Sequence, residues 1–422
     1  MAVSSISFLI HYHRLTGNQS DFAIPFCSQY LTAYQLTPFA FVRETLRVLS
    51  YALTKKRKTA TTFWKDNSTV IIGPQTINLS VFRSFLSLQI EHLEDLFRTS
   101  ILFGKRLDDL GITVDFRTIT DNGNMTTLAY SPLLESIHGN RDSNILLNFM
   151  LEEKSVVEID PEDNKMKWDV AGAEKWLGDI HRATSWVQAA AHITQGAPGR
   201  MTEEAKSQLT NTEVGRRHLV ILQSLNTLAL WSNYSKTTKV TGAFKEVLRV
   251  YPHRIARLIF ILVRLVRPIE VLYLIKHRHA QVPEELERVV TAYKSKLWTS
   301  FGLPFTPDQM CENLADFLMS DDGGPFPFRF GVRLYRELAT AVQRRHIRIP
   351  IKYSRAVAQE GAQVGDLQAG RSTQTSLQNY AVEKSVVDME PGFIEHYISY
   401  SRSWQNFWGL DLEGADAANY SV

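Results

Sequence analysis

The sequence predicts a mainly α protein with a small antiparallel β-sheet, an α+β fold arranged in two domains. Apolar residues recur three and four positions apart along 78–102 and along 331–347, which is the periodicity of amphipathic helices. Short apolar runs at 214–231 and 247–252 are instead bounded by polar turns, as strands are. A polar turn at 160–164 (DPEDN) separates two halves. We therefore expect one domain over 1–165 and another over 166–410.

The composition is that of a soluble globular protein. Of 422 residues, 44% are hydrophobic and 22% are charged, and the net charge of +3 permits a nucleic-acid partner without requiring one. The most apolar stretch, 255–275, contains Arg257, Arg264 and Arg267, so no membrane span is expected. The two cysteines, far apart in sequence, cannot by themselves form a zinc site or a disulfide framework.

The first domain is predicted to be largely helical. A helix is expected over 39–53, and 69–77 is a strand or a buried connection before the long helix 78–102. A basic run follows the first helix, and two interpretations stay open: a phosphate-contacting or nuclear-targeting patch, or a solvated helix end. Its members are Lys55, Lys56, Arg57 and Lys58.

The second domain begins with a helix over 173–195. Two glycines and a proline at 196–199 end this helix and are followed by Arg200, with Glu203 three positions later. The two apolar runs in 214–231 and the run 247–252 predict a small antiparallel sheet. The basic loop 234–239 between them carries Lys236 and Lys239.

Cationic residues gather again toward the end of the chain. A helix is expected over 254–274, broken by Pro268, and the helix 331–347 places Arg333 and Arg336 on one face, with Arg344 and Arg345 at its end. Taken singly, these arginines and Arg200 also fit solvated or capping roles. An aromatic segment at 383–409 predicts a helix that packs on the body or on a partner, and the tail 411–422 is expected to be disordered.

The stretch 366–381 (DLQAGRSTQTSLQNYA) combines a small turn, a polar cluster and a tyrosine. Gly370, Arg371 and Ser372 form the turn, and Tyr380 follows Arg371 by nine residues. One interpretation is an amphipathic helix in which Tyr380 only packs against its neighbours. The order in which the arginines, the lysine and the tyrosine follow one another along the chain favours a catalytic interpretation.

That order resembles the catalytic domain of the tyrosine recombinase (integrase) family. Arg200 and Glu203 match its Arg-x-x-Glu box, and Lys236, with Lys239 as the alternative, matches its hairpin lysine. Arg336 matches the second arginine, Arg371 stands at the turn histidine, and Tyr380 has the spacing of the nucleophile. The segments GAPGRMTEE, YSKTTK and DLQAGRSTQTSLQNYA also resemble recombinase-like segments of fungal mobile elements, including those before telomere-linked RecQ-like helicase domains. The resemblance covers roughly 170–385.

The resemblance implies a two-domain architecture in which 1–165 clamps DNA and 166–410 catalyses strand cleavage and rejoining. Tyr380 would form a 3′-phosphotyrosyl link without metal or other cofactor, and Lys236 would protonate the leaving oxygen. Further DNA contacts would come from residues in the basic run, the hairpin, the late helix and the turn, namely Lys55, Lys56, Arg57, Lys58, Lys239, Arg344, Arg345 and Ser372. The resemblance also implies that the partner is double-stranded DNA, on which the protein self-associates, and that no membrane is involved. It further implies a nuclear location and a helicase or other domain in a longer parent protein.

Two departures from the family leave the activity open. Arg333 replaces the usual histidine of the second arginine box, and Arg371 replaces the turn histidine. Arginine stays charged and is a poor proton shuttle, although it still donates hydrogen bonds to phosphate. The alternatives are therefore a degenerate, domesticated DNA-binding module without catalysis, and a helical protein-interaction scaffold supported by the aromatic segment 383–409.

Overall fold

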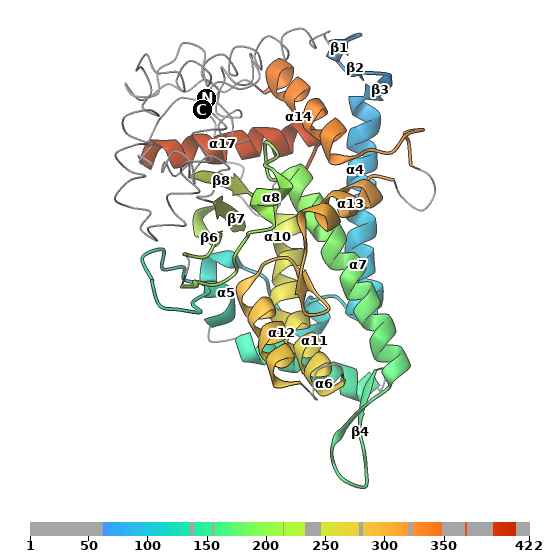
Figure 1. The fold of residues 1–422 in the computed structure, drawn as a ribbon, viewed down its shortest axis with the longest axis vertical. Helices are drawn as coiled ribbons and strands as arrows, with labels where there is room; N and C mark the ends of the chain where they lie inside the picture. The colour runs from blue at the N-terminus through green and yellow to red at the C-terminus, as the bar shows by residue number, and fades with distance from the viewer. Residues whose placement is uncertain are drawn as a thin grey trace, which may run out of the picture. The chain divides into compact units, whose positions relative to one another are not determined.

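The computed structural model describes residues 62–135, 139–153, 156–213, 215–232, 246–277, 282–319, 324–347, 368 and 391–410. The chain divides into two compact units, Met1–Thr61 and Thr62–Val422, and every described residue belongs to the second. This unit is mainly helical with small antiparallel sheets, which confirms the predicted fold class (Figure 1). The division predicted at residue 165 remains a prediction.

An antiparallel three-stranded sheet opens the described chain and leads into a long helix. Its strands are β1 (Thr62–Trp64), β2 (Thr69–Ile72) and β3 (Gln75–Asn78), so the stretch expected to be a strand or connection is two strands. Helix α4 (Leu79–Leu96) begins where the Asn78 side chain accepts hydrogen bonds from the N–H groups of Ser80 and Val81. A π-helical turn, η1 (Phe97–Ile101), extends it to the end of the predicted range.

Helix α7 (Val170–Thr194) lies lengthwise in the middle of the unit and contacts both α4 and α13 (Pro307–Phe317) (Figure 1). Asp169 caps its start, and nearly every residue of its second half is buried. A helix surrounded by protein on all sides carries small apolar residues, and the run 189–191 is three alanines with no exposed surface. The predicted helix 173–195 is confirmed.

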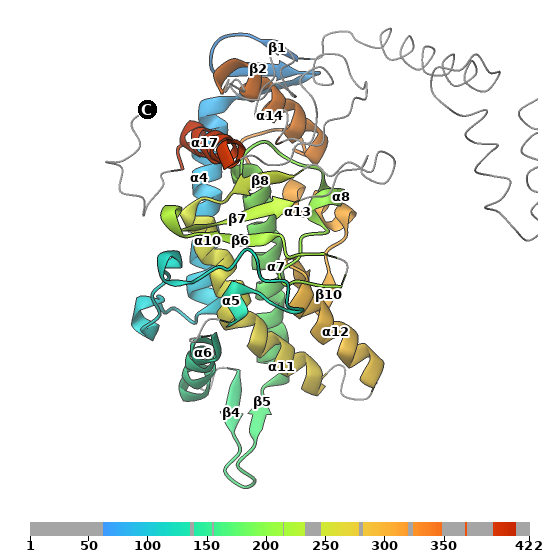
Figure 2. The ribbon, with the colours of Figure 1, turned by 90° about the vertical axis from the view of Figure 1, so that its left-hand side faces the viewer.

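The predicted antiparallel sheet is present in the second half of the chain. Strands β6 (Leu219–Leu222), β7 (Thr227–Ser232) and β8 (Val247–Val250) pair in that order, each antiparallel to the next. Asn226 turns the chain between β6 and β7 in the left-handed region, with a φ of 50°. Helix α17 (Pro391–Trp408) lies across the β8 side of this sheet (Figures 1 and 2).

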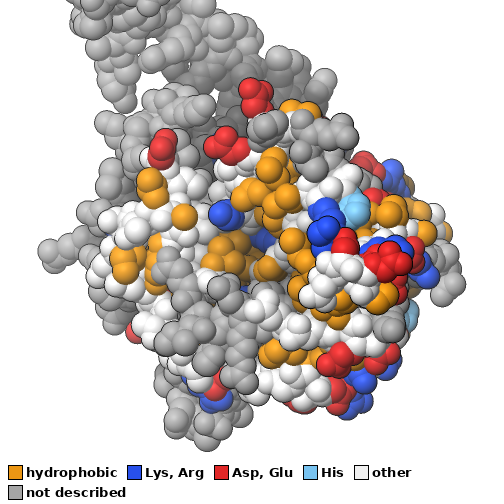
Figure 3. Space-filling model, turned by 90° about the horizontal axis from the view of Figure 1, so that it is seen from below, with side chains coloured by type: hydrophobic (Ala, Val, Ile, Leu, Met, Phe, Trp, Pro, Cys, Tyr) orange, Lys and Arg blue, Asp and Glu red, His pale blue; other side chains and the backbone are white. Residues whose placement is uncertain are grey.

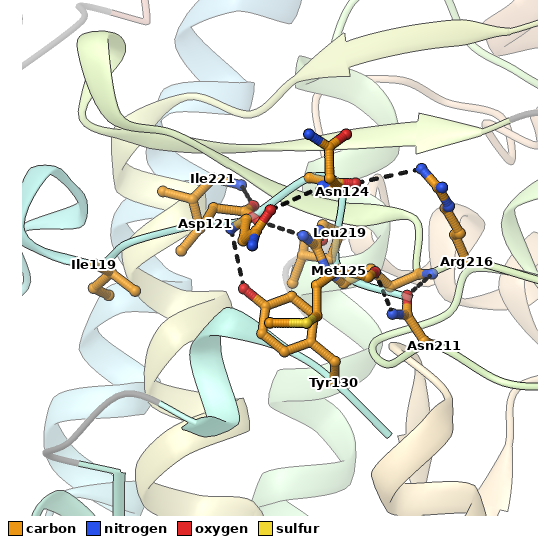
Figure 4. Close-up of polar contacts among 12 residues, drawn as sticks. Ile119, Asp121, Asn124, Met125, Tyr130, Asn211, Arg216, Leu219 and Ile221 are labelled. Carbon is orange, nitrogen blue, oxygen red and sulfur yellow. Dashed lines mark hydrogen bonds and ion pairs between the residues drawn. The ribbon is translucent and has the colours of Figure 1, made fainter. Parts of the chain in front are cut away.

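A buried ion pair fastens the 119–130 segment to β6 (Figure 4). The Arg217 guanidinium pairs with the Asp121 carboxylate, and both side chains are almost closed off from solvent. The second Asp121 oxygen accepts a hydrogen bond from the N–H of Ile221 at 2.8 Å. Asn211 adds bonds from its side-chain amide to the carbonyls of Met125 and Thr127. These contacts hold the 119–130 segment against the sheet.

The remaining helices complete the core. After α5 (Pro132–Glu135), α6 (Gly139–Glu153) and the hairpin of β4 (Val157–Ile159) with β5 (Met166–Trp168) come the elements of the second half. These are α8 (Met201–Glu204), α10 (His253–Phe260), the π-helical turn η5 (Ile261–Val266), α11 (Arg267–His277), α12 (Pro283–Ser295), β9 (Thr299–Ser300), β10 (Leu303–Pro304) and α14 (Val332–His346).

The structure decides two predictions about helices in the second half of the chain. The predicted break at Pro268 is wrong: the α-helical pattern is interrupted before it, by the π-helical turn η5, and Pro268 is the second residue of α11, in the first turn of a helix, where proline is tolerated. The aromatic C-terminal segment does form a helix, α17, and its Tyr397, Tyr400 and Trp404 are buried in the chain's own core. None of the described helices is long and apolar enough to cross a bilayer.

Candidate functional site

The turn between α7 and α8 brings Arg200 to the surface and depends on two glycines. Gly196 has a φ of +123°, and a Cβ on it would lie 2.2 Å from Oε1 of Gln368. A Cβ on Gly199 would lie 2.9 Å from Nη2 of Arg249. The first glycine is required by backbone conformation and space, the second by space alone.

Arg200 is held by the acid three positions after it. Its Nη1 lies 2.9 Å from Oε1 of Glu203, and its backbone N–H donates to the other oxygen at 3.3 Å. The Glu203 side chain is only 8% exposed, whereas that of Arg200 is 24% exposed. The remaining N–H groups of the guanidinium make no hydrogen bond to a described residue. Arg200 therefore presents an oriented, partly accessible set of donors.

Arg249 lies beneath this turn and was not singled out from the sequence. It projects from β8, is buried, and donates from Nε to the carbonyl of Ala197 at 3.2 Å and from Nη2 to the carbonyl of Gln368. Burial lowers the pKa of Arg249, while the nearby carboxylates of Glu203 and Glu204 oppose that shift. An arginine inside an apolar strand, VLRV, is the sequence signal that could have marked it.

Glu204 forms a second buried polar group behind Glu203. Its Oε2 lies 2.5 Å from Nδ1 of His192, and its Oε1 accepts a hydrogen bond from the Gln188 amide at 3.2 Å. Gln188 and His192 are four residues apart on α7 and therefore share one face. No pattern in the sequence connects Gln188 and His192 with Glu204. The two carboxylates and two arginines together surround a small hollow, which is also lined by Gln195, Leu230 and Ser232.

Gln368 connects the stretch 366–381 to the Arg200 turn. Its side-chain oxygen accepts a hydrogen bond from the N–H of Ala197 at 2.8 Å. Its amide nitrogen donates to the carbonyl of Leu248 at 2.8 Å and to the hydroxyl of Ser401 at 2.9 Å. Gln368 has no exposed surface. One side chain thus joins the turn, the β-sheet and α17.

The other predicted site residues within the described part of the chain lie on α14. Arg333 is 94% exposed and bonds Glu337 one turn later at 3.2 Å. Arg336 is half-buried, and its neighbour Tyr335 donates to the carbonyl of Ile193 at 2.9 Å, which joins α14 to the end of α7.

The end of α14 has different surroundings. Arg344 is exposed. Arg345 bonds Asn67 at 2.5 Å and lies over the Trp64 ring at 4.7 Å, so its contacts are with the β1–β2 hairpin. Of the predicted residues, Arg200 and Glu203 therefore lie together in the turn that Gln368 contacts, whereas Arg333 and Arg345 contact other residues.

The rest of the predicted set lies outside the described residues, namely Lys55, Lys56, Arg57, Lys58, Lys236, Lys239, Arg371, Ser372 and Tyr380. In the sequence, Lys236 follows the described Ser232 by four residues, and Arg371 follows the described Gln368 by three. Across the described ranges, no group of three or more His, Cys, Asp or Glu side chains is placed to hold a metal ion.

Comparisons with models of protein families, with curated proteins and with solved structures found no match to this chain.

Proposed function

We propose that this chain is a DNA-binding protein of the tyrosine recombinase type that cleaves and rejoins DNA strands through Tyr380. The observation that carries the proposal is the contact of Gln368 with the Arg200 turn. Gln368 belongs to the same stretch as Arg371 and Tyr380, which follow it by three and twelve residues. The contact of Gln368 therefore supports a shared site for Arg200, Arg371 and Tyr380.

The described residues suit the binding of a phosphodiester. Arg200 is oriented by Glu203 and keeps donors that a nonbridging phosphate oxygen can accept from. Arg336 stands on α14 beside Tyr335, which anchors that helix to the end of α7. Ser232 lines the hollow next to Arg200, and the lysine four positions later is our candidate general acid. Lys239 is the alternative.

The proposed reaction forms one bond and breaks one. Tyr380 gives its proton to water as its oxygen bonds to phosphorus, and the bond from phosphorus to the 5′-oxygen breaks. Lys236 donates a proton to that oxygen, and arginines stabilise the charge on the nonbridging oxygens. A 5′-hydroxyl of a second strand reverses the step. Self-association on DNA, a nuclear location, and a mobile-element parent with a helicase or other domain belong to the same proposal.

Denaturing capture of covalent adducts tests this mechanism. The full chain is incubated with a random-sequence pool of nicked duplexes, in which loss of the short strand traps the phosphotyrosyl link. We expect an adduct that is lost in Tyr380→Phe and retained in Tyr420→Phe, the matched control in the tail. An adduct that persists in Tyr380→Phe would overturn the assignment of the nucleophile.

A non-catalytic DNA-binding module is the second candidate, and Arg371 in place of the turn histidine favours it. It retains the phosphate-binding arginines but lacks a residue that can shuttle a proton. Duplex binding that weakens with salt, without any adduct, would select this candidate over the first. Absence of duplex binding at low salt would exclude both.

A protein-interaction scaffold is the third candidate. The main argument for it was the aromatic segment near the C-terminus, which could have bound a partner. In α17 the side chains of Tyr397, Tyr400, Trp404 and Trp408 are buried within the chain itself. They stabilise the core and present little surface to a partner.

A further inference from the structure

A second cleft lies apart from the Arg200 turn, between the end of α4, the 102–108 segment and α10. Its volume is about 460 Å³, which is within the range of small-ligand sites. Phe97, Leu107 and Leu258 contribute to an apolar floor. The cleft includes none of the residues assigned to DNA cleavage, so its role is independent of that proposal.

Cations outnumber carboxylates in this cleft. Arg254 is neutralised by Glu94 through two bonds of 2.8 and 2.6 Å, and Arg98 pairs with Asp95 outside the lining. Lys105, Arg106 and Arg257 remain, opposed only by Asp108. The lining therefore carries uncompensated positive charge next to apolar surface.

Two of these cations are available to a ligand. Arg106 and Arg257 are exposed, and among the described residues neither side chain makes a hydrogen bond or ion pair. They come from different segments, the stretch after η1 and helix α10. Lys105, half-buried, has its ammonium 5.2 Å from the centre of the Phe149 ring. Three cations from two segments suit a group with several anionic oxygens, and arginine binds phosphate through paired donors.

We propose that this cleft binds a nucleoside phosphate, with the phosphate at Arg106, Arg257 and Lys105 and the base against the apolar floor. A cleft of this volume is large enough for one nucleotide. The ligand is either a free nucleotide or one residue of a single strand, since both present the same phosphate and base.

Calorimetric titration of the full chain tests the site. The probes are AMP, adenosine, inorganic phosphate and a short single-stranded oligodeoxynucleotide. The variants are Arg106→Ala/Arg257→Ala and the control Arg288→Ala, which removes an exposed arginine of α12. Thermal melting confirms that each variant is folded.

We expect AMP to bind at least about tenfold more tightly than either adenosine or phosphate, because both parts of the cleft contribute. The double variant should lose at least about tenfold in affinity, while Arg288→Ala stays within about twofold of the unaltered chain. Binding of the oligodeoxynucleotide alone, lost in the double variant, would identify a strand as the source. Absence of binding by every probe, equal affinity for phosphate and AMP, or unchanged affinity in the double variant would overturn the proposal.

Discussion

The side-chain oxygen of Gln368 accepts a hydrogen bond from the N–H of Ala197, a residue 171 positions earlier in the chain. The same side chain donates to Leu248 and Ser401. Three buried groups therefore bond to one amide, and each loses that bond if the amide is removed, although the Ser401 hydroxyl keeps its contacts with Gln195 and Val250.

We expect Gln368→Ala to lower the free energy of unfolding by about 2–4 kcal/mol, because buried polar groups left without partners cost about 1–3 kcal/mol each and relax in part. Urea denaturation measures the change. Asn406→Ala, an exposed amide on α17, serves as the control and should change stability by less than about 0.5 kcal/mol. A loss no larger than that of the control would mean that Gln368 does not hold the turn.

Gly196→Ala should destabilise the protein by about 1–3 kcal/mol, because the backbone is left-handed and the new methyl group meets Gln368. The loss should be smaller when introduced into Gln368→Ala, since that variant removes the steric conflict. A double-mutant cycle measures this coupling. Gly178→Ala, at an open and exposed position of α7, should instead stabilise by up to about 1 kcal/mol. Simple additivity of the first two changes would argue against the contact.

Asp121→Ala should cost about 3–5 kcal/mol, because it leaves the Arg217 guanidinium buried without its counter-charge. Asp95→Ala is the matched control: its ion pair with Arg98 is about half exposed, and its loss should cost less than about 1 kcal/mol. Denaturant unfolding of both variants gives the comparison. Equal effects would show that the Asp121 pair is not buried in solution.

The free energy of unfolding should fall as the pH rises from about 4.5 to about 7, because the buried carboxyl of Glu270 titrates in this interval. Burial raises the pKa of this carboxyl to about 7, although Tyr293 donates a hydrogen bond to it and Arg267 lies nearby. Over this interval the folded state holds a proton that the unfolded state has released, so the free energy of unfolding declines by up to about 3 kcal/mol.

Glu270→Gln removes this titration, and its unfolding free energy should depend less steeply on pH over the same interval. Denaturant titrations at several pH values measure the slope. Glu284→Gln, an exposed position on α12, provides the control and should keep the slope of the unaltered chain. An unchanged slope in Glu270→Gln would contradict the prediction.

Local patterns were sufficient to predict the helices and the antiparallel sheet. The spacing of Phe82, Leu86 and Leu93 predicts α4 because helix periodicity is read within one segment. The contacts of Gln368 and Arg249 could not be predicted, since each joins segments far apart in sequence; the VLRV pattern marks Arg249 as unusual but does not name its partners. The contact of His192 with Glu204 spans only 12 residues, but it crosses the turn between two helices, which periodicity within one helix does not describe. The pairing of Arg200 with Glu203 could be predicted from the sequence, because the two residues lie about one helical turn apart.

The contact between Phe82 and Trp408, with ring centres 4.9 Å apart, has a consequence for biosynthesis. Phe82 is fully buried in the folded chain, yet its partner on α17 is made about 300 residues later. At ordinary translation rates this interval is on the order of tens of seconds. Phe82 also contacts Phe326 and Phe330, which are made earlier than Trp408, so the aromatic cluster around the start of α4 is completed only in the last stage of synthesis.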